Sequence, residues 1–184
     1  MARHQDNASE RILDSFEDVL IANGDSQVTL EGVAAQAQLT KGGLLYHFRS
    51  RAALVAALVD RFELRTRDDL EEMTDAAEGA AVSYLKVLDY LSSPLHRTTL
   101  AMSQLANSEP TAADSLVRSR EAELEVLTAD VGDPVISRLI VVFAEGLLFQ
   151  ASTRPDASRE NAAVVEWFKT HVLATYAKRP RPLR

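Results

Sequence analysis

Apolar side chains recur along the chain at intervals of three and four residues, and no strand-like alternation of any length occurs. The first stripe follows a polar N-terminus, and its spacing is typical of one face of a helix. It consists of Ile12, Leu13, Phe16, Val19 and Leu20. Similar spacing continues to Tyr176, so the sequence predicts an all-α chain of about nine helices.

Capping residues predict where these helices begin and end. Gly24 ends the first helix, and Thr29 and Thr40 are natural N-caps for two short helices over 30–37 and 41–48. Further helix starts are expected at Ser50, Glu78, Pro94, Pro110, Pro134 and Ser158. The helix from Glu78 is expected to extend to Leu91.

Composition narrows the class of protein. The chain has 184 residues, 46% of them apolar, and a net charge of −7, which is an ordinary globular mixture. With no cysteine, disulfide scaffolds, thiolate metal sites and cysteine nucleophiles are excluded. The polar N-terminus is unlike a signal peptide, and the most apolar run, 139–149, is expected to be too short to cross a bilayer. We therefore expect a soluble, cytoplasmic protein with no membrane partner.

Positive charge is concentrated in one window of this acidic chain. Residues 38–51 contain Lys41, Arg49 and Arg51 and no acidic residue. Such a window indicates that an anion binds there and is repelled elsewhere. The alternative is an ordinary solvated helix surface.

The local architecture favours the anion. The two short helices and the turn 38–40 form a helix-turn-helix, whose second helix suits the major groove of DNA. Gly42 and Gly43 lie in its first turn, where each costs about 1 kcal/mol relative to alanine. Without side chains, the backbone there can closely approach a base or phosphate. A tight helical hairpin is the alternative.

Residues 29–54 resemble the DNA-binding segment of the TetR family, the tetracycline-repressor-like bacterial regulators. The chain reads Thr-Leu-Glu-Gly-Val-Ala from Thr29 and Thr-Lys-Gly-Gly-Leu-Leu-Tyr-His-Phe-Arg-Ser-Arg from Thr40. It departs from the family pattern at Leu45, where a tyrosine is usual, so Tyr46 is expected to replace it. It also has Gln38 where the family favours glycine, so Gln38 is expected to be left-handed.

The resemblance implies roles for individual residues. Those expected to contact phosphates are Thr29, Tyr46, His47 and Arg51. Those expected to face base edges are Thr40, Lys41, Gly42 and Gly43. Lys41 is the best candidate for reading guanine, whose O6 and N7 are both acceptors.

The resemblance also implies a division of the chain. Residues 1–50 would be the three-helix DNA-binding domain, and 51–184 a helical bundle for effector binding and dimerisation. A homodimer would form through the last two long helices. The apolar stripe expected at that interface is Val164, Val165, Phe168 and Val172, although an internal core would need the same stripe.

The middle helices are expected to line an effector pocket. The candidates mix aromatic, soft and polar side chains, and each is equally compatible with plain core. They are Met73, Tyr84, Tyr90, His96, Met102, Gln104, Phe143 and Gln150.

The function expected is that of a ligand-responsive repressor, which binds palindromic double-stranded operator DNA as a homodimer and is released by a small molecule. A repressor with no ligand response and an all-α protein–protein adaptor are the alternatives. No enzyme, cofactor or metal site is expected, because the four histidines lack metal-ligand spacing and neither a phosphate-binding glycine loop nor a Gly-x-Ser-x-Gly motif occurs.

Overall fold

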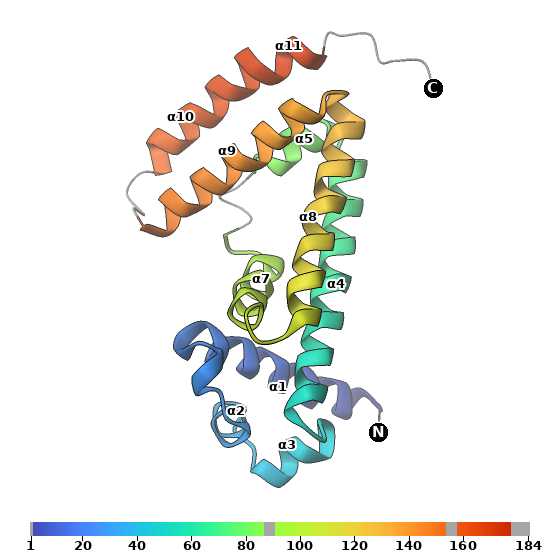
Figure 1. The fold of residues 1–184 in the computed structure, drawn as a ribbon, viewed down its shortest axis with the longest axis vertical. Helices are drawn as coiled ribbons and strands as arrows, with labels where there is room; N and C mark the ends of the chain where they lie inside the picture. Colours follow the sequence, from blue (N-terminus) through green and yellow to red (C-terminus); the bar gives the residue numbers. More distant parts are fainter. Residues whose placement is uncertain (1, 87–90, 154–157, 178–184) are drawn as a thin grey trace. The chain divides into compact units, whose positions relative to one another are not determined.

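A computed structural model describes residues 2–86, 91–153 and 158–177, and no strand occurs among them. The all-α prediction is therefore confirmed. The chain divides into two compact units (Figure 1). Unit 1 comprises Met1–Thr66 and Pro94–Arg118, and unit 2 comprises Arg67–Ser93 and Ser119–Arg184. This structural division differs from the functional boundary at 50/51 expected from the sequence, because unit 1 also takes in segments from the middle of the chain.

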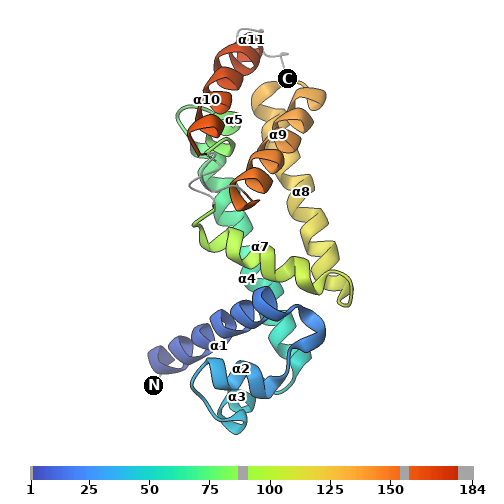
Figure 2. The same ribbon diagram turned by 90° about the vertical axis from the view of Figure 1, so that its left-hand side faces the viewer.

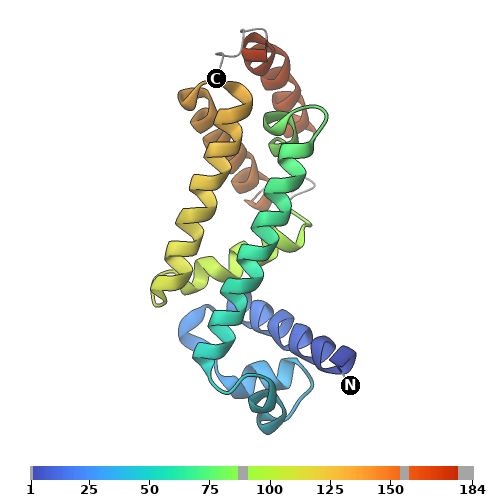
Figure 3. The same cartoon turned by 90° about the vertical axis from the view of Figure 1, so that its right-hand side faces the viewer.

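Unit 1 is built around the first helix. Its elements are α1 (Ala2–Asn23), η1 (Asp25–Gln27), α2 (Leu30–Gln36), α3 (Lys41–His47), the first part of α4 (Arg51–Asp75), α7 (Pro94–Leu105) and the first part of α8 (Pro110–Val131). Helix α1 lies between α7 on one side and α2 and α3 on the other (Figures 1 and 3). The helix-turn-helix is therefore on the side of α1 opposite α7.

The predicted stripe on α1 forms the core of unit 1. Ile12, Phe16 and Leu20 have no exposed surface. The buried residues they join from other elements of this unit include Val33, Leu44, Leu54, Leu58, Phe62, Met102 and Leu105. This core receives side chains from α1, α2, α3, α4 and α7. It therefore packs the helix-turn-helix, formed by α2 and α3, against the other helices of unit 1.

Unit 2 contains the rest of α4 and α8 together with elements from the middle and the end of the chain. These are α5 (Ala80–Tyr84), α9 (Pro134–Thr153), α10 (Ser158–Phe168), the π-helical segment η3 (Lys169–Leu173) and α11 (Ala174–Ala177). Helices α9 and α10 run side by side (Figures 1 and 2). Their buried faces contribute Ile140, Ala144, Leu147 and Phe168 to the core of unit 2. Met73, Leu85, Leu127 and, from η3, Leu173 complete this part of the core.

Most predicted helix starts are confirmed. The Ser50 hydroxyl accepts a bond from the Ala53 amide (3.1 Å), and Asp133 Oδ1 accepts one from the Val135 amide (3.0 Å). These bonds satisfy amides that have no partner within the helix. The helix expected from Glu78 is shorter than predicted. It runs from Ala80 to Tyr84, and the helix expected from Pro94 begins there.

Helix α9 bears on the expectation about membrane crossing. By length and composition, its segment Pro134–Ala151 is long and apolar enough to span a bilayer, and 28% of it is buried. The buried part, including Ile140 and Ala144, packs in the core of unit 2. One such helix is weak support for a membrane span, since core helices of soluble proteins have the same composition.

Candidate nucleic-acid interface

Threonine caps define both helices of the helix-turn-helix. Thr29 Oγ1 accepts a hydrogen bond from the Gly32 amide (3.1 Å), and Thr40 Oγ1 accepts one from the Gly43 amide (3.0 Å). Both threonines have extended backbones, as N-caps do. The two predicted caps are confirmed, and they fix where α2 and α3 begin.

The turn between the helices has the geometry expected for it. Gln38 has φ of 58°, the left-handed conformation that the family pattern usually assigns to glycine. The chain leaves α2 through bonds from the Gln38 amide to the Ala35 carbonyl (3.1 Å) and from the Leu39 amide to the Ala34 carbonyl (2.8 Å). This turn sets the direction in which α3 starts.

Helix α1 holds the helix-turn-helix by polar contacts at both ends. Arg11 Nη2 donates to the Ala37 carbonyl at the end of α2 (2.8 Å). Ser9 Oγ lies 3.3 Å from His47 Nδ1 at the end of α3. With Val33 and Leu44 fully buried, α2 and α3 present only their outer faces to solvent.

The outer face of α3 carries most of the residues expected to contact DNA. Lys41, Gly42 and Tyr46 are exposed, and 72% of Tyr46 is accessible. Leu45 is only partly exposed, so Tyr46 is the aromatic side chain that reaches outward. Its ring meets the His47 ring edge-on, with centroids 5.3 Å apart.

Neighbouring atoms leave room for a side chain at Gly42, the first residue of the glycine pair. A Cβ on Gly42 would meet only Thr40 Oγ1, at 3.9 Å, which is an ordinary contact. A Cβ on Gly43 would lie 3.4 Å from the same atom, at the limit of a comfortable contact. Packing within unit 1 therefore does not require glycine at position 42.

Lys41 is paired with an acidic residue of the neighbouring helix. Its Nζ lies 2.6 Å from Oε1 of Glu31, in the first turn of α2, and both side chains are more than half exposed. The hydrogen bond from Lys41 is the main reason that the pKa of Glu31 is lowered. The residue expected to read guanine thus has a carboxylate beside it.

Arg51 is less available than the sequence suggested. Its guanidinium forms ion pairs with Asp25 of η1 and Glu109, which precedes α8. Ser108 also donates to Asp25 (2.6 Å), so these four side chains form one polar cluster within unit 1. Arg49, in contrast, is exposed in the loop between α3 and α4.

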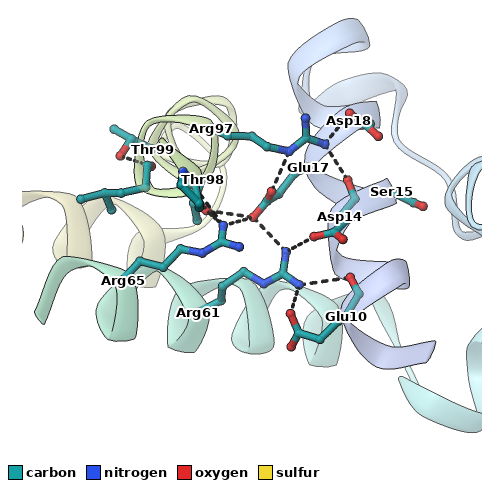
Figure 4. A network of polar contacts seen from close by, with 12 residues as sticks. Glu10, Asp14, Ser15, Glu17, Asp18, Arg61, Arg65, Arg97, Thr98 and Thr99 are labelled. Carbon is teal, nitrogen blue, oxygen red and sulfur yellow. Dashed lines mark hydrogen bonds and ion pairs between the residues drawn. The ribbon is translucent and has the colours of Figure 1, made fainter. Parts of the chain in front are cut away.

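The sequence did not predict a buried ionic network that joins α1 to its neighbours in unit 1. Glu17 of α1 has no exposed surface, and its carboxylate accepts bonds from Arg61 (3.1 Å), Arg97 (3.0 Å) and Thr98 (2.9 Å), as Figure 4 shows. Arg65 also contacts this carboxylate, at 3.2 Å. The network therefore connects α1 to α4 and α7.

Neighbouring acids complete the network. Arg61 also donates to Asp14 (2.8 Å), and Arg97 forms an ion pair with Asp18 (Figure 4). Burial lowers the pKa of Arg61, but the neighbouring carboxylates raise it by more. One sequence signal was available, since Glu17 lies in the apolar stripe of α1 between Leu13 and Leu20, where an unpaired charge would be costly.

The residues expected to line an effector pocket fall in different units. Met73, Tyr84 and Phe143 belong to the core of unit 2 or pack against it. Met102 is fully buried in unit 1, where His96 is half-buried and Gln104 is exposed. Gln150 is exposed on α9, and Tyr90 lies outside the described residues. Of the residues expected to line an effector pocket, Met73, Tyr84 and Phe143 of unit 2 therefore lie together around one core, unlike those in unit 1.

Tyr84 belongs to a polar cluster in unit 2. Its hydroxyl donates to Glu123 Oε2 (3.0 Å), and Arg120 donates to the same carboxylate oxygen (2.7 Å). Arg120 also pairs with Glu145 of α9. Burial raises the pKa of Glu123, and burial with the charges of Glu123 and Glu72 raises the pKa of Asp69 to about 6. This part of unit 2 carries an excess of negative charge.

The expected dimer stripe is largely internal. Phe168 is 5% exposed and stacks on Phe143, with ring centroids 4.3 Å apart and planes 11° from parallel. Val165 and Val172 pack against the same core. Phe168 is therefore unavailable to a partner, because its own chain already covers it, whereas Val164 remains exposed.

A different set of apolar side chains on α9 and α10 is exposed. On α9 they follow a spacing of three, four and seven residues, which places them on one face. The exposed apolar face, as we call it, consists of Val135, Leu139, Val142 and Phe149 on α9 and Val164 and Trp167 on α10. Trp167 stacks on His171, with centroids 4.7 Å apart.

Comparison with known proteins agrees with this architecture. Residues 12–58 match the sequence model of bacterial regulatory proteins of the tetR family. A comparison with curated proteins finds no match.

Several solved structures share the fold along nearly the whole chain. A TetR transcription regulator from Haloarcula marismortui is 16% identical, with a TM-score of 0.67 over 93% of this chain and 98% of that one. The SmeT–triclosan complex is 18% identical, with a TM-score of 0.65 over 97% and 99%. NalD, the secondary repressor of the MexAB-OprM multidrug efflux pump in Pseudomonas aeruginosa, is 17% identical, with a TM-score of 0.60 over 88% and 96%.

At these identities the solved structures establish the fold alone. The matched segment contains the second half of α1, all of α2 and α3 with the turn between them, and the start of α4. In sequence and geometry, the helix-turn-helix segment over residues 12–58 is therefore similar to that of bacterial regulatory proteins of the tetR family.

Proposed function

We propose that this protein is a transcriptional regulator of the tetR family, a ligand-responsive repressor that works in the cytoplasm and binds a palindromic operator as a homodimer. The observation that carries this proposal is the outer face of α3, where Lys41, Gly42 and Tyr46 are exposed while Val33 and Leu44 anchor the motif from within. Such a face suits entry into the major groove.

The contacts to DNA divide into two kinds. Lys41, Gly42, Gly43 and Thr40 would face base edges and determine sequence preference. Thr29, Tyr46 and His47 would contact phosphates and fix the register. We assign the remaining phosphate contact to exposed Arg49 rather than to Arg51, because Arg51 is already held by two carboxylates.

The exposed apolar face supports a homodimer. Phe149 is 69% exposed, Val135 74% and Trp167 58%, and apolar side chains at this exposure and spacing are typical of an interface. If α9 and α10 meet the same helices of a second copy, the interface is isologous and the two helix-turn-helix motifs are related by a two-fold axis. A palindromic operator matches that symmetry.

Repression and ligand response are the finer parts of the proposal. NalD is described as a repressor, and SmeT was solved with triclosan, so proteins of this fold include both a repressor and a protein that binds a small molecule. In this chain, the best candidates for lining an effector site are Met73, Tyr84 and Phe143, which share the core of unit 2.

The response would act through unit 1. Glu17 ties α1 to α4 and α7, so the helix-turn-helix, the start of α4 and α7 would move together. Half-sites on one face of DNA lie about 34–36 Å apart. An effector that tilts α4 would change the separation of the two copies of α3, and a shift of a few ångströms would prevent both from docking.

Two measurements test the proposal. A mobility shift with DNA from upstream of the protein's own gene should show saturable binding by a dimer, and no shift with this DNA or with a random duplex would favour the adaptor alternative. A thermal-shift screen of small molecules should then find a compound that stabilises the protein and releases the DNA. A repressor without ligand response would bind DNA but give no such compound.

A further inference from the structure

An exposed ion pair joins the two helices of the helix-turn-helix. Glu31 lies in the first turn of α2, Lys41 is the first residue of α3, and Oε1 and Nζ are 2.6 Å apart. The residues that follow each of them, Gly32 and Gly42, are exposed and have no side chain. The ion pair of Glu31 and Lys41 therefore lies on a surface whose backbone can approach DNA closely.

We propose that Glu31 and Lys41 act as one unit that reads a single C·G base pair in each half-site. Lys41 Nζ donates to guanine O6 and N7, and the Glu31 carboxylate accepts from the amino group on cytosine N4. Glu31 is thereby a specificity-determining residue. This assignment rests on the proposed function, because it places α3 in the major groove.

The spacing of the ion pair matches the base pair. Guanine O6 and cytosine N4 are joined by a Watson–Crick hydrogen bond, so they lie about 3 Å apart. Nζ and Oε1 are 2.6 Å apart, and each group has hydrogen-bonding capacity beyond the bond between them. Lys41 and Glu31 can keep their mutual contact while each contacts one base.

Other base pairs fit less well. A T·A pair also presents an acceptor beside a donor, but it has the thymine methyl group where guanine has N7. It also places adenine N7, an acceptor, beside the donor, where it repels the Glu31 carboxylate. The pair is therefore selective for C·G in one orientation.

The Glu31 carboxylate lowers the general affinity for DNA, and this cost favours a role in base recognition over an accidental position. Next to DNA it repels phosphates, so it weakens binding to every sequence. A residue that lowers general affinity and accepts one particular base raises the ratio between correct and incorrect sites. A purely structural Glu31, which only stabilises the first turn of α2, would leave sequence preference unchanged.

The first experiment selects binding sites from a randomised duplex pool. Wild-type protein should enrich a palindrome with one C·G pair per half-site that both Glu31→Ala and Lys41→Ala no longer require. Asp114→Ala, which removes an exposed carboxylate of α8 in unit 1, should retain the full preference. Failure of the wild type to enrich any sequence contradicts the proposed function. An enriched palindrome that Glu31→Ala still reads identically overturns this inference alone.

The second experiment tests which base atoms, cytosine N4 and guanine N7, are contacted by Glu31 and Lys41. A selected duplex carrying N4-methylcytosine at that pair keeps its pairing but loses the outward N4 hydrogen. It should bind wild-type protein about tenfold more weakly and leave Glu31→Ala unaffected. The 7-deazaguanine duplex, which lacks N7, should weaken wild type and Glu31→Ala but not Lys41→Ala. Equal loss for wild type and Glu31→Ala on the methylated duplex overturns the inference.

A conservative variant keeps the test independent of folding. Glu31→Gln retains an acceptor, adds a donor and removes the charge. It should bind random DNA more tightly and tolerate adenine in place of cytosine, since an amide can bond adenine N6 and N7 together. Unchanged selectivity in Glu31→Gln, with wild-type circular dichroism, contradicts a role for Glu31 in base recognition.

Discussion

Glycine 42 is the residue at which stability and function should separate most clearly. Its Cβ position is open, so Gly42→Ala costs nothing in packing. Alanine is favoured over glycine within a helix by about 1 kcal/mol. We therefore expect Gly42→Ala to raise the free energy of unfolding by up to about 1 kcal/mol and to weaken operator binding, because the new methyl group holds α3 off the groove.

Urea denaturation and fluorescence anisotropy measure the two effects. Ala129→Gly, at an exposed position of α8 in unit 2, is the matched control and should lower stability without changing DNA affinity. A Gly42→Ala protein that is more stable and binds the operator normally would remove the argument for close approach.

Arg49 and Arg51 should differ in how they affect the salt dependence of binding. Each phosphate contact contributes about −0.9 to the slope of log K against log salt concentration. Arg49→Ala should flatten the slope by about that amount per half-site. Arg51→Ala should leave it unchanged and destabilise unit 1 by about 1 kcal/mol, because Arg51 bridges Asp25 and Glu109. If Arg51→Ala flattens the slope and Arg49→Ala does not, Arg51 contacts phosphate and Arg49 does not.

The basic window itself was readable from the sequence, but the partners of its cations were not. Asp25 and Glu109 lie 26 and 58 residues from Arg51 along the chain, and no local pattern connects them. The position of Gln38 was predictable, in contrast, because its left-handed backbone is a property of the turn alone.

At the scale of helices, local signals predicted starts better than lengths. The caps at Thr29, Thr40 and Ser50 were correct because a cap depends on a side chain and amides within three residues. The helix expected over 78–91 was too long. Its first turn depends on a distant residue, since Asp130 Oδ2 accepts the bond from the Ala81 amide.

The attachment of α1 to its neighbours should depend on Glu17. Glu17→Gln keeps the shape of the side chain but leaves Arg61, which is almost fully buried, without its central counter-charge. Breaking a buried ion pair from one side costs about 3–5 kcal/mol. We expect a loss of that order in the free energy of unfolding, measured by urea denaturation.

Asp18→Asn is the control for Glu17→Gln, because Asp18 pairs with Arg97 at a partly exposed position. It should cost less than about 1 kcal/mol. If both variants lose equally little, the Glu17 network does not hold α1 to α4 and α7.

Stability should also depend on pH through the pairing of α4 with α8 in unit 2. Burial, followed by the charges of Glu123 and Glu72, raises the pKa of Asp69 to about 6, above the value of about 3.9 in an unfolded chain. The folded protein therefore holds this proton more tightly. The resulting stabilisation is complete below pH 4 and is lost as the pH rises through 6.

Asp69→Asn should remove that loss. We expect it to raise the free energy of unfolding at pH 7 by about 1–2 kcal/mol, a value reduced for the partial exposure of the side chain, and to have little effect at pH 4. Asp68→Asn, at the exposed neighbouring position, should change neither value. A gain from Asp69→Asn that is the same at both pH values would exclude titration of Asp69 as its cause.

For the whole molecule, the sequence predicted that the last helix would be buried but not what would bury it. A stripe with helical spacing looks the same whether its own chain or a second copy covers it. Phe168 and Trp167 are adjacent, yet Phe168 stacks on Phe143 inside unit 2 and Trp167 is 58% exposed. The predicted seam was therefore placed on the wrong face at Phe168.

Trp167→Arg is the variant that should separate assembly from folding. Because its side chain is exposed, arginine at this position fits the monomer, whereas in an isologous interface the change acts twice and brings two positive charges near the two-fold axis. We expect a folded monomer by sedimentation and circular dichroism that binds the operator far more weakly, since one half-site supplies only half of the contacts. Phe168→Arg should instead unfold unit 2, and Val117→Arg, at an equally exposed apolar position of unit 1, should leave a dimer with normal affinity. If Trp167→Arg remains a dimer with wild-type affinity, α10 does not form the interface, and the exposed apolar face must be covered in another way.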